Sequence, residues 1–164
     1  MFAVRASFII GALDEPGENS MTNWTTQMSL WCGGVIAFGL LLISGAFAAT
    51  DGAMTLLLEV LGAETPIAYD SLHRFSIALM GAVSLGWGAT LLAVARITPD
   101  LSAPQAQKLW RMVTWSVLLW FVVDSSLSVA TGFWRNAIPN TVLLGWYLLL
   151  MARLPGGAGQ MARA

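Results

Sequence analysis

The stretch from Phe75 to Ala95, FSIALMGAVSLGWGATLLAVA, decides the class of fold. It contains 21 consecutive residues without a charged side chain and lies between Arg74 and Arg96. An α-helix needs about 20 predominantly apolar residues to cross the hydrocarbon core of a bilayer, which is about 30 Å thick. The length of this run therefore predicts a membrane-spanning helix.

Three other parts of the chain are almost as free of charge. Glu18 and Asp51 are separated by 32 uncharged residues, residues 112–134 carry only Asp124, and residues 136–152 carry no charge. Unpaired backbone groups in hydrocarbon cost several kcal/mol each, so helices are favoured, and the runs lack the strict alternation of barrel strands. We predict an all-α polytopic membrane protein, a four-helix transmembrane bundle with spans at about 29–49, 73–95, 110–133 and 137–153.

The composition argues against several other classes of protein. Hydrophobic residues make up 57% of the chain and charged residues 10%, whereas soluble domains average about 45–50% and about 25%. A soluble bundle of core helices is therefore disfavoured. The net charge of −1 gives no basis for binding nucleic acid. One cysteine and one histidine exclude an internal disulfide and the usual structural zinc sites.

The rest of the chain divides around these spans. We expect residues 1–28 to form a disordered lead, residues 29–154 the transmembrane domain, and residues 155–164 a flexible tail. Residues 1–20 do not match a signal peptide, because their short apolar stretch is followed by acidic residues, and Met21 is a second candidate for the first residue. In the loop from Thr50 to Ser71, apolar residues recur at helical spacing. This predicts either a short helix on the membrane surface or over the bundle mouth, or an extension of the first helix.

The basic residues predict the orientation, because loops on the cytoplasmic side carry an excess of lysine and arginine. With both termini in the cytoplasm of an inner-membrane protein, the outer side holds only Arg74 and Arg135. The cytoplasmic side then holds six basic residues: Arg5, Arg96, Lys108, Arg111, Arg153 and Arg163.

Helix ends and helix contacts also leave signals. Asp70 is a candidate N-cap for the second span, Ser102 and Gln105 form a candidate capping box before the third, and Asn136 is a candidate N-cap before the fourth. Small residues permit close approach of helices in membranes. The second span carries them on two faces, one with Gly81, Ser84 and Gly88 and one with Ala78, Ala82, Gly86, Ala89 and Ala93.

Tryptophan is abundant, with eight residues. Those at the ends of predicted spans are expected at the headgroup level, where amphipathic rings are favoured: Trp31, Trp110 and Trp134. Those at greater depth are expected to pack between helices, with a quinone, pigment or carotenoid site as the alternative: Trp87, Trp115, Trp120 and Trp146.

Asp124 is the most informative single residue. A carboxylate at membrane depth costs about 2.5–3.5 kcal/mol on insertion scales, so it is expected to face the bundle interior and a partner. We expect that partner to be Arg74, whose guanidinium matches a carboxylate, or else His73. The predicted polar cluster is completed by Trp120, Ser128, Thr131, Asn136 and Asn140. Three interpretations stay open: an interhelical clasp, a pocket for a small ligand, and a proton relay.

The order of features resembles small bacterial four-helix membrane proteins of the DoxX-like and related kinds. The resemblance rests on Asp70-Ser71-Leu72-His73-Arg74, on the glycines Gly81, Gly86 and Gly88, and on the segment from Asp124 to Asn140. It covers roughly Trp31 to Met151. It implies an architecture and an inner-membrane location, and it carries over no functional residue.

The sequence lacks the motifs that most enzymes and cofactor proteins need. It has no second histidine for a bis-histidine haem, no glycine-rich phosphate loop and no serine nucleophile motif. We expect no enzymatic activity and no cofactor. We expect a membrane accessory subunit or small-ligand binder with a polar site near the outer face, or alternatively a small proton-coupled carrier using Asp124. The expected partners are the lipid bilayer and further copies or other subunits of a membrane complex, with no nucleic acid.

Overall fold

The computed structural model describes residues 16–64 and 66–155, and the described residues are helical throughout apart from turns and short loops. The prediction of an all-α fold is confirmed. In chain order the elements are α1 (Pro16–Ser44), α2 (Gly52–Leu61), α3 (Ser71–Ile97), the short 3-10 helix η1 (Thr98–Asp100), α4 (Ala103–Ala130), the 3-10 helix η2 (Trp134–Asn136) and α5 (Ala137–Ala152).

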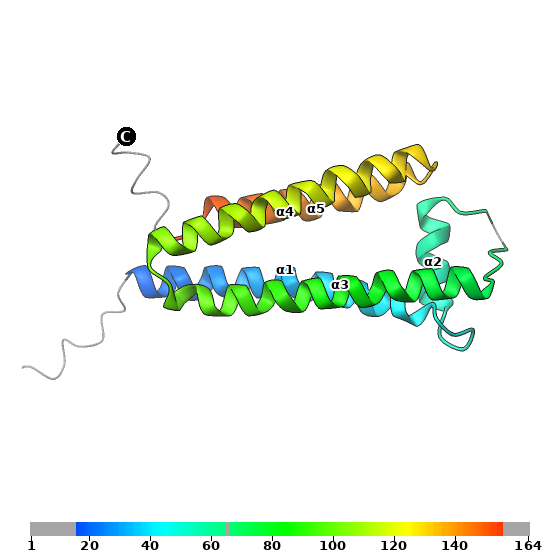
Figure 1. Cartoon of the computed structure of the whole chain (residues 1–164), viewed down its shortest axis with the longest axis horizontal. Coiled ribbons are helices and arrows are strands. Elements are labelled where there is room, and N and C mark those ends of the chain that lie inside the picture. The colour runs from blue at the N-terminus through cyan, green and yellow to red at the C-terminus, as the bar shows by residue number, and fades with distance from the viewer. Residues whose placement is uncertain (1–15, 65, 156–164) are drawn as a thin grey trace, which may run out of the picture.

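The long helices form two layers (Figure 1). One layer is the antiparallel pair of α1 and α3, and the other is the antiparallel pair of α4 and α5. Helix α1 begins and helix α5 ends at the same end of the bundle, which we call the terminal end. At the opposite end, which we call the α2 end, the short helix α2 lies across the space between the layers.

The contact between α1 and α3 is the most extensive in the structure, and glycines make it possible. A Cβ atom added at Gly81 would lie only 2.6 Å from the carbonyl oxygen of Gly39, and one added at Gly39 would lie 2.7 Å from the backbone nitrogen of Leu85. The predicted small-residue face with Gly81 and Gly88 therefore packs against α1. The second predicted face points away from the bundle, since a Cβ at Gly86 would meet nothing within 4 Å.

The core lies at the terminal end, where all four long helices meet. Its largest fully buried side chains include Trp31, Trp110 and Tyr147. The indole nitrogen of Trp31 donates to the carbonyl of Leu143 at 3.0 Å, and that of Trp110 donates to the hydroxyl of Thr98 at 2.9 Å. Trp31 and Trp110 therefore face the core of the bundle, so their rings do not make the contact with lipid headgroups that was expected at the ends of spans. Both indoles have found internal hydrogen-bond acceptors, so burial leaves no donor unpaired.

Three helices are long and apolar enough to cross a membrane, namely Asn19–Ser44, Ser71–Asp100 and Ala103–Ala130. Helix α5 has 16 residues, which gives about 24 Å at 1.5 Å per residue. That is less than the roughly 30 Å of hydrocarbon that a straight span must cross. Of the four predicted spans, the first three therefore correspond to helices that are long and apolar enough to cross a membrane, and the fourth does not.

The first helix begins earlier than predicted. Residues 16–28 belong to α1, so the expected disordered lead is wrong for this part, and residues 1–15 and 156–164 lie outside the described residues. The helix continues because Trp24 and Met28 lie on the same side as Trp31 and are buried in the core. The indole of Trp24 also donates to the carbonyl of Leu150 at 2.9 Å.

The loop after α1 contains a separate helix. The chain turns between Ser44 and Thr50, and α2 then runs to Leu61, where Gly62 with a φ of 102° ends it. The left-handed conformation of Gly62 lets its amide bond the carbonyl of Glu59 at 3.0 Å. The prediction of a short helix over the bundle mouth is confirmed in its position, and the alternative of an extended first helix is wrong.

Two of the predicted helix starts have the expected capping bonds. Asp70 accepts a 2.8 Å hydrogen bond from the amide of His73, and the side chain of Gln105 accepts one of 3.1 Å from the amide of Ser102. Helix α5 begins after Asn136 as predicted, but the side chain of Asn136 makes no capping bond and points elsewhere.

The cap at Asp70 predicts a pH dependence of stability. Hydrogen bonds from the amide of His73, with smaller contributions from its ring, hold the pKa of Asp70 below its ordinary value of 3.8. A carboxyl with a lowered folded-state pKa contributes stability above its unfolded pKa and loses it as the pH falls through the folded value. We expect the unfolding midpoint of the Asp70→Asn variant to fall below that of the wild type by a constant amount above about pH 5, and the difference to shrink below about pH 4.

Thermal unfolding in detergent across this pH range measures the difference, with Asp100→Asn as the control for the loss of one negative charge. A difference that stays constant down to pH 2.5 would contradict the role of the Asp70 carboxylate.

Candidate functional site: an apolar cleft with one carboxylate

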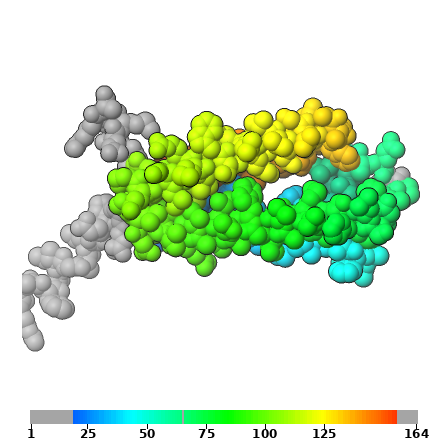
Figure 2. Space-filling model, viewed as in Figure 1, coloured from blue at the N-terminus to red at the C-terminus, as the bar shows by residue number. Residues whose placement is uncertain are grey.

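The two layers separate toward the α2 end and leave a cleft between them. Figure 2 shows this hollow between the surfaces of α3 and α4, and it narrows toward the terminal end, where the layers meet. The cleft consists of two adjoining cavities of about 480 Å³ and about 630 Å³, which share Phe38, Trp120 and Asn140 among their lining residues. Cavities of this size match those that hold small organic ligands.

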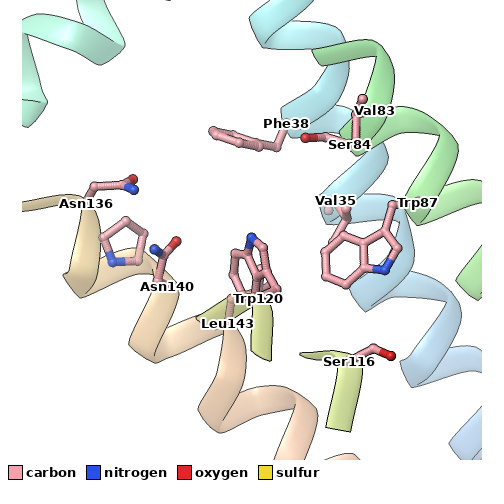
Figure 3. Close-up of a pocket in the computed structure, with 12 residues that line it drawn as sticks. Val35, Phe38, Val83, Ser84, Trp87, Ser116, Trp120, Asn136, Asn140 and Leu143 are labelled. Atoms are coloured by element: carbon pink, nitrogen blue, oxygen red, sulfur yellow. The ribbon is translucent and has the colours of Figure 1, made fainter. Parts of the chain in front are cut away.

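The walls of the cleft are mostly apolar and come from every helix of the bundle. Figure 3 shows Phe38 of α1, Trp87 of α3, and Trp120 and Leu143 of α4 and α5 around the cavity of about 480 Å³, which we call the deeper cavity. The cavity of about 630 Å³ is the outer cavity. The rings of Trp87 and Trp120 are 5.6 Å apart between centroids and tilted by 41°. The α2 end of the cleft is lined by apolar side chains of α2, which are Met54, Leu57, Leu58 and Leu61.

A compact polar group occupies one wall, where α4 faces α5. The amide nitrogens of Asn136 and Asn140 both donate to the same carboxylate oxygen, Oδ2, of Asp124, the former at 3.1 Å. Asn136 also donates to the hydroxyl of Ser128 at 2.9 Å, and Ser128 donates in turn to the backbone carbonyl of Asp124 at 2.8 Å. These bonds join the end of α4 to the start of α5 and fix the direction of the carboxylate.

The fold explains why these four residues meet. Asp124 and Ser128 are one helical turn apart and therefore share a face of α4. Asn136 and Asn140 are likewise one turn apart, and the tight connection through η2 turns their side chains back toward α4. The predicted cluster of Asp124 with Ser128, Asn136 and Asn140 is thus brought together.

Two further members of the predicted cluster line the cleft without bonding to the carboxylate. Trp120 is one turn before Asp124 and borders both cavities. Thr131 lines the outer cavity, and its hydroxyl donates to the carbonyl of Leu127 at 2.8 Å.

The predicted partners of Asp124 are wrong. Arg74 donates to the carboxylate of Asp51 and to the carbonyl of Gly45 at 2.8 Å and 3.1 Å. His73 is exposed and lies 2.8 Å from Asp70. The physical reason is the layering: α3 packs on α1, so its first turn meets the turn between α1 and α2, whereas Asp124 belongs to the other layer. Among the described residues, none with a basic side chain forms an ion pair with Asp124.

Helix α2 lies over the cleft, and hydrogen bonds from other elements hold both its N-terminus and its C-terminus. Its N-cap residue Asp51 pairs with Arg74 of α3. Near its C-terminus, the carbonyl of Val60 accepts a 3.3 Å hydrogen bond from Arg135, which belongs to η2 in the other layer. A cation at this position is also favoured by the negative end of the helix dipole.

The predicted polar cluster contains none of the residues that the first layer contributes to the cleft, although Trp87 was a candidate for an aromatic ligand site. Phe38, Val83 and Ser84 line both cavities, and Trp87 lines the deeper one. Val83, Ser84 and Trp87 share a face of α3 by helical spacing, which is a usable signal. That face is indistinguishable from a packing face until the separation of the two layers is known.

Comparisons with protein-family models, with curated proteins and with solved structures found no match. The residues that line the cleft are therefore the evidence for its chemistry. It offers a large apolar surface, one carboxylate and two amide side chains, and the described residues contain no group of three or more metal ligands. Such a lining is typical of sites for molecules with an apolar body and one polar group.

Proposed function

We propose that this chain is an integral membrane protein that binds a small amphipathic molecule in the cleft between its two layers, alone or as an accessory subunit of a larger complex. The observation that carries the proposal is a mostly apolar cleft whose one carboxylate and two amide side chains are gathered on one wall, at Asp124. An apolar pocket with a few convergent polar groups is the typical form of a small-molecule site.

The same proposal covers the membrane. We propose that α1, α3, α4 and α5 cross the inner membrane, with the shorter α5 supported by its partner α4 and by η2. The outward surfaces support this, because large apolar side chains such as Leu79, Met112 and Leu119 are more than half exposed. The terminal end carries Arg96, Lys108, Arg111 and Arg153, which favours the cytoplasmic side for that end.

A proton-coupled carrier is supported less well. A carrier has to open its site alternately to both sides of the membrane. In this structure the terminal end is filled by Trp31, Trp110 and Tyr147, all three at most 2% exposed. The cleft opens between α3 and α4, and α2 lies over its α2 end. A site that is closed at the terminal end and open between two outward-facing helices favours a binder.

The proposal predicts that the protein retains a small molecule when it is isolated. We expect native mass spectrometry of the full chain, extracted from its own membrane in mild detergent, to show an adduct. We expect Ser84→Trp to abolish that adduct, because Ser84 lines both cavities and an indole there would fill the cleft. The matched control is Ala82→Trp, two residues away on an exposed face of α3, which should keep the adduct.

The absence of any adduct from the wild-type protein would count against the proposal. So would an adduct retained equally by the wild type and both variants, because the molecule would then lie outside the cleft.

A further inference from the structure

We propose that the molecule bound in the cleft is an amphipathic cation, with its ammonium group at Asp124 and its apolar body against Trp120 and Trp87. This inference rests on the proposed function and adds the chemical class of the ligand. The juxtaposition that carries it is a carboxylate without a cationic partner, one helical turn from a pair of indole rings, on the wall of an apolar cleft.

The carboxylate is the first part of the argument. Of the described residues that line the two cavities, Asp124 is the only ionisable one. Its hydrogen-bond donors are two neutral amides, and both bond to Oδ2, so Oδ1 receives no hydrogen bond from the described residues. A carboxylate in apolar surroundings is costly unless a positive charge compensates it.

The nearby basic residues are engaged elsewhere and do not supply that charge. Arg74 pairs with Asp51. Arg135 donates to the carbonyl of Val60 and lies over the ring of Trp134, 5.9 Å from its centroid. His73 lies against Asp70. A cationic group bound in the cleft would supply that charge.

The aromatic wall is the second part of the argument. Indole faces attract cations, and tryptophan is the best of the aromatic side chains in this respect. Trp120 is one turn from Asp124 on the same face of α4, and its ring lies against that of Trp87. Figure 3 shows Asn136, Asn140 and Trp120 directed into one space, with Phe38 and Trp87 across it. An ammonium group at Asp124 would place its substituents over these rings.

Neutral and anionic molecules fit this site less well. A neutral amphiphile can fill the apolar volume, but it leaves the Asp124 charge uncompensated. An anion adds repulsion to that cost. Binding should therefore decrease in the order cation, neutral molecule, anion for probes of the same shape.

A set of three probes with the same naphthalene body and a similar small polar group tests the inference: 1-naphthylmethylammonium, 1-naphthalenemethanol and 1-naphthoate. The full chain is placed in nanodiscs of zwitterionic lipid, and binding is measured by isothermal titration calorimetry against empty nanodiscs. We expect the ammonium probe to bind the wild type at least tenfold more tightly than the alcohol, and the carboxylate probe not to bind saturably. In Asp124→Asn the preference for the ammonium probe over the alcohol should fall below twofold.

Equal affinities of the ammonium probe and the alcohol for the wild type would overturn the inference, as would an ammonium preference that persists in Asp124→Asn. Should Asp124→Asn fail to fold, the wild-type ranking and Asp124→Glu, which keeps the charge and should keep the preference, decide the matter. Saturable binding of the alcohol alone, abolished by Ser84→Trp, would overturn the cationic ligand and leave the proposed function standing. No saturable binding of any probe, together with the absence of a native adduct, would reject both.

Discussion

Replacing Trp110 by alanine should lower the free energy of unfolding by about 3–5 kcal/mol, the usual range for removing a buried aromatic side chain. Trp110 is 2% exposed and packs edge-on against Trp24 with ring centroids 5.2 Å apart. It also donates to Thr98, which is fully buried. Truncation leaves a cavity where all four long helices meet, so no single helix can move to fill it.

The same helix supplies a matched control. Trp115 is five residues further along α4 and 69% exposed, so Trp115→Ala should change the free energy of unfolding by about 0.5 kcal/mol or less. Unfolding of both variants by sodium dodecyl sulfate in mixed micelles, followed by circular dichroism, measures the two losses. Comparable losses would mean that the core does not lie at the terminal end.

Adding one methyl group at Gly81 should destabilise the protein by about 1–3 kcal/mol, as expected for overpacking. The new Cβ would lie 2.6 Å from the carbonyl oxygen of Gly39 and 2.8 Å from the backbone nitrogen of Ile43. Both atoms belong to the backbone of α1, so no side chain can rotate away. The two helices have to separate along their most extensive contact.

Gly86→Ala is the control for the Gly81→Ala variant. It lies on the same helix, and its new Cβ would meet nothing within 4 Å. Alanine is also favoured over glycine inside a helix by up to about 1 kcal/mol, so stability should be unchanged or slightly higher. The midpoints of thermal unfolding in detergent should therefore rank Gly86→Ala at or above the wild type and Gly81→Ala well below it. The reverse order would place the α1–α3 contact on the other face of α3.

The sequence predicts the fold to the extent that charge and hydropathy control it. The spacing of charged residues predicted four spans, whereas three helices are long and apolar enough to cross a membrane. Asp70 and Gln105 lie where helices α3 and α4 begin. The start of α1 was missed because residues 19–27 are polar enough to suggest a loop. Met21 and Trp24, seven and four residues before Met28, indicate the buried face that keeps this segment helical.

The sequence could predict the contacts of the candidate site between residues that are close in sequence, but not those between distant segments. Asp124, Ser128, Asn136 and Asn140 are close in sequence, and helical spacing with a short connection brings them together. The pairing of Arg74 with Asp51 depends on where α2 lies, and that position is fixed by contacts between distant segments. Charge complementarity alone cannot choose between two carboxylates when the layer that carries each one is unknown.

The two layers are joined unequally: at the terminal end they pack through the buried side chains of Trp31, Trp110 and Tyr147. At the α2 end they are linked through α2, whose hydrogen bond from Arg135 to the carbonyl of Val60 is exposed. A small rotation of one layer about the terminal end would therefore change the distance between the layers most at the α2 end and least among the buried indoles. Under the proposed function, this geometry predicts that ligands of different thickness are accommodated by the spacing of the layers at the α2 end, while the packing at the terminal end stays unchanged.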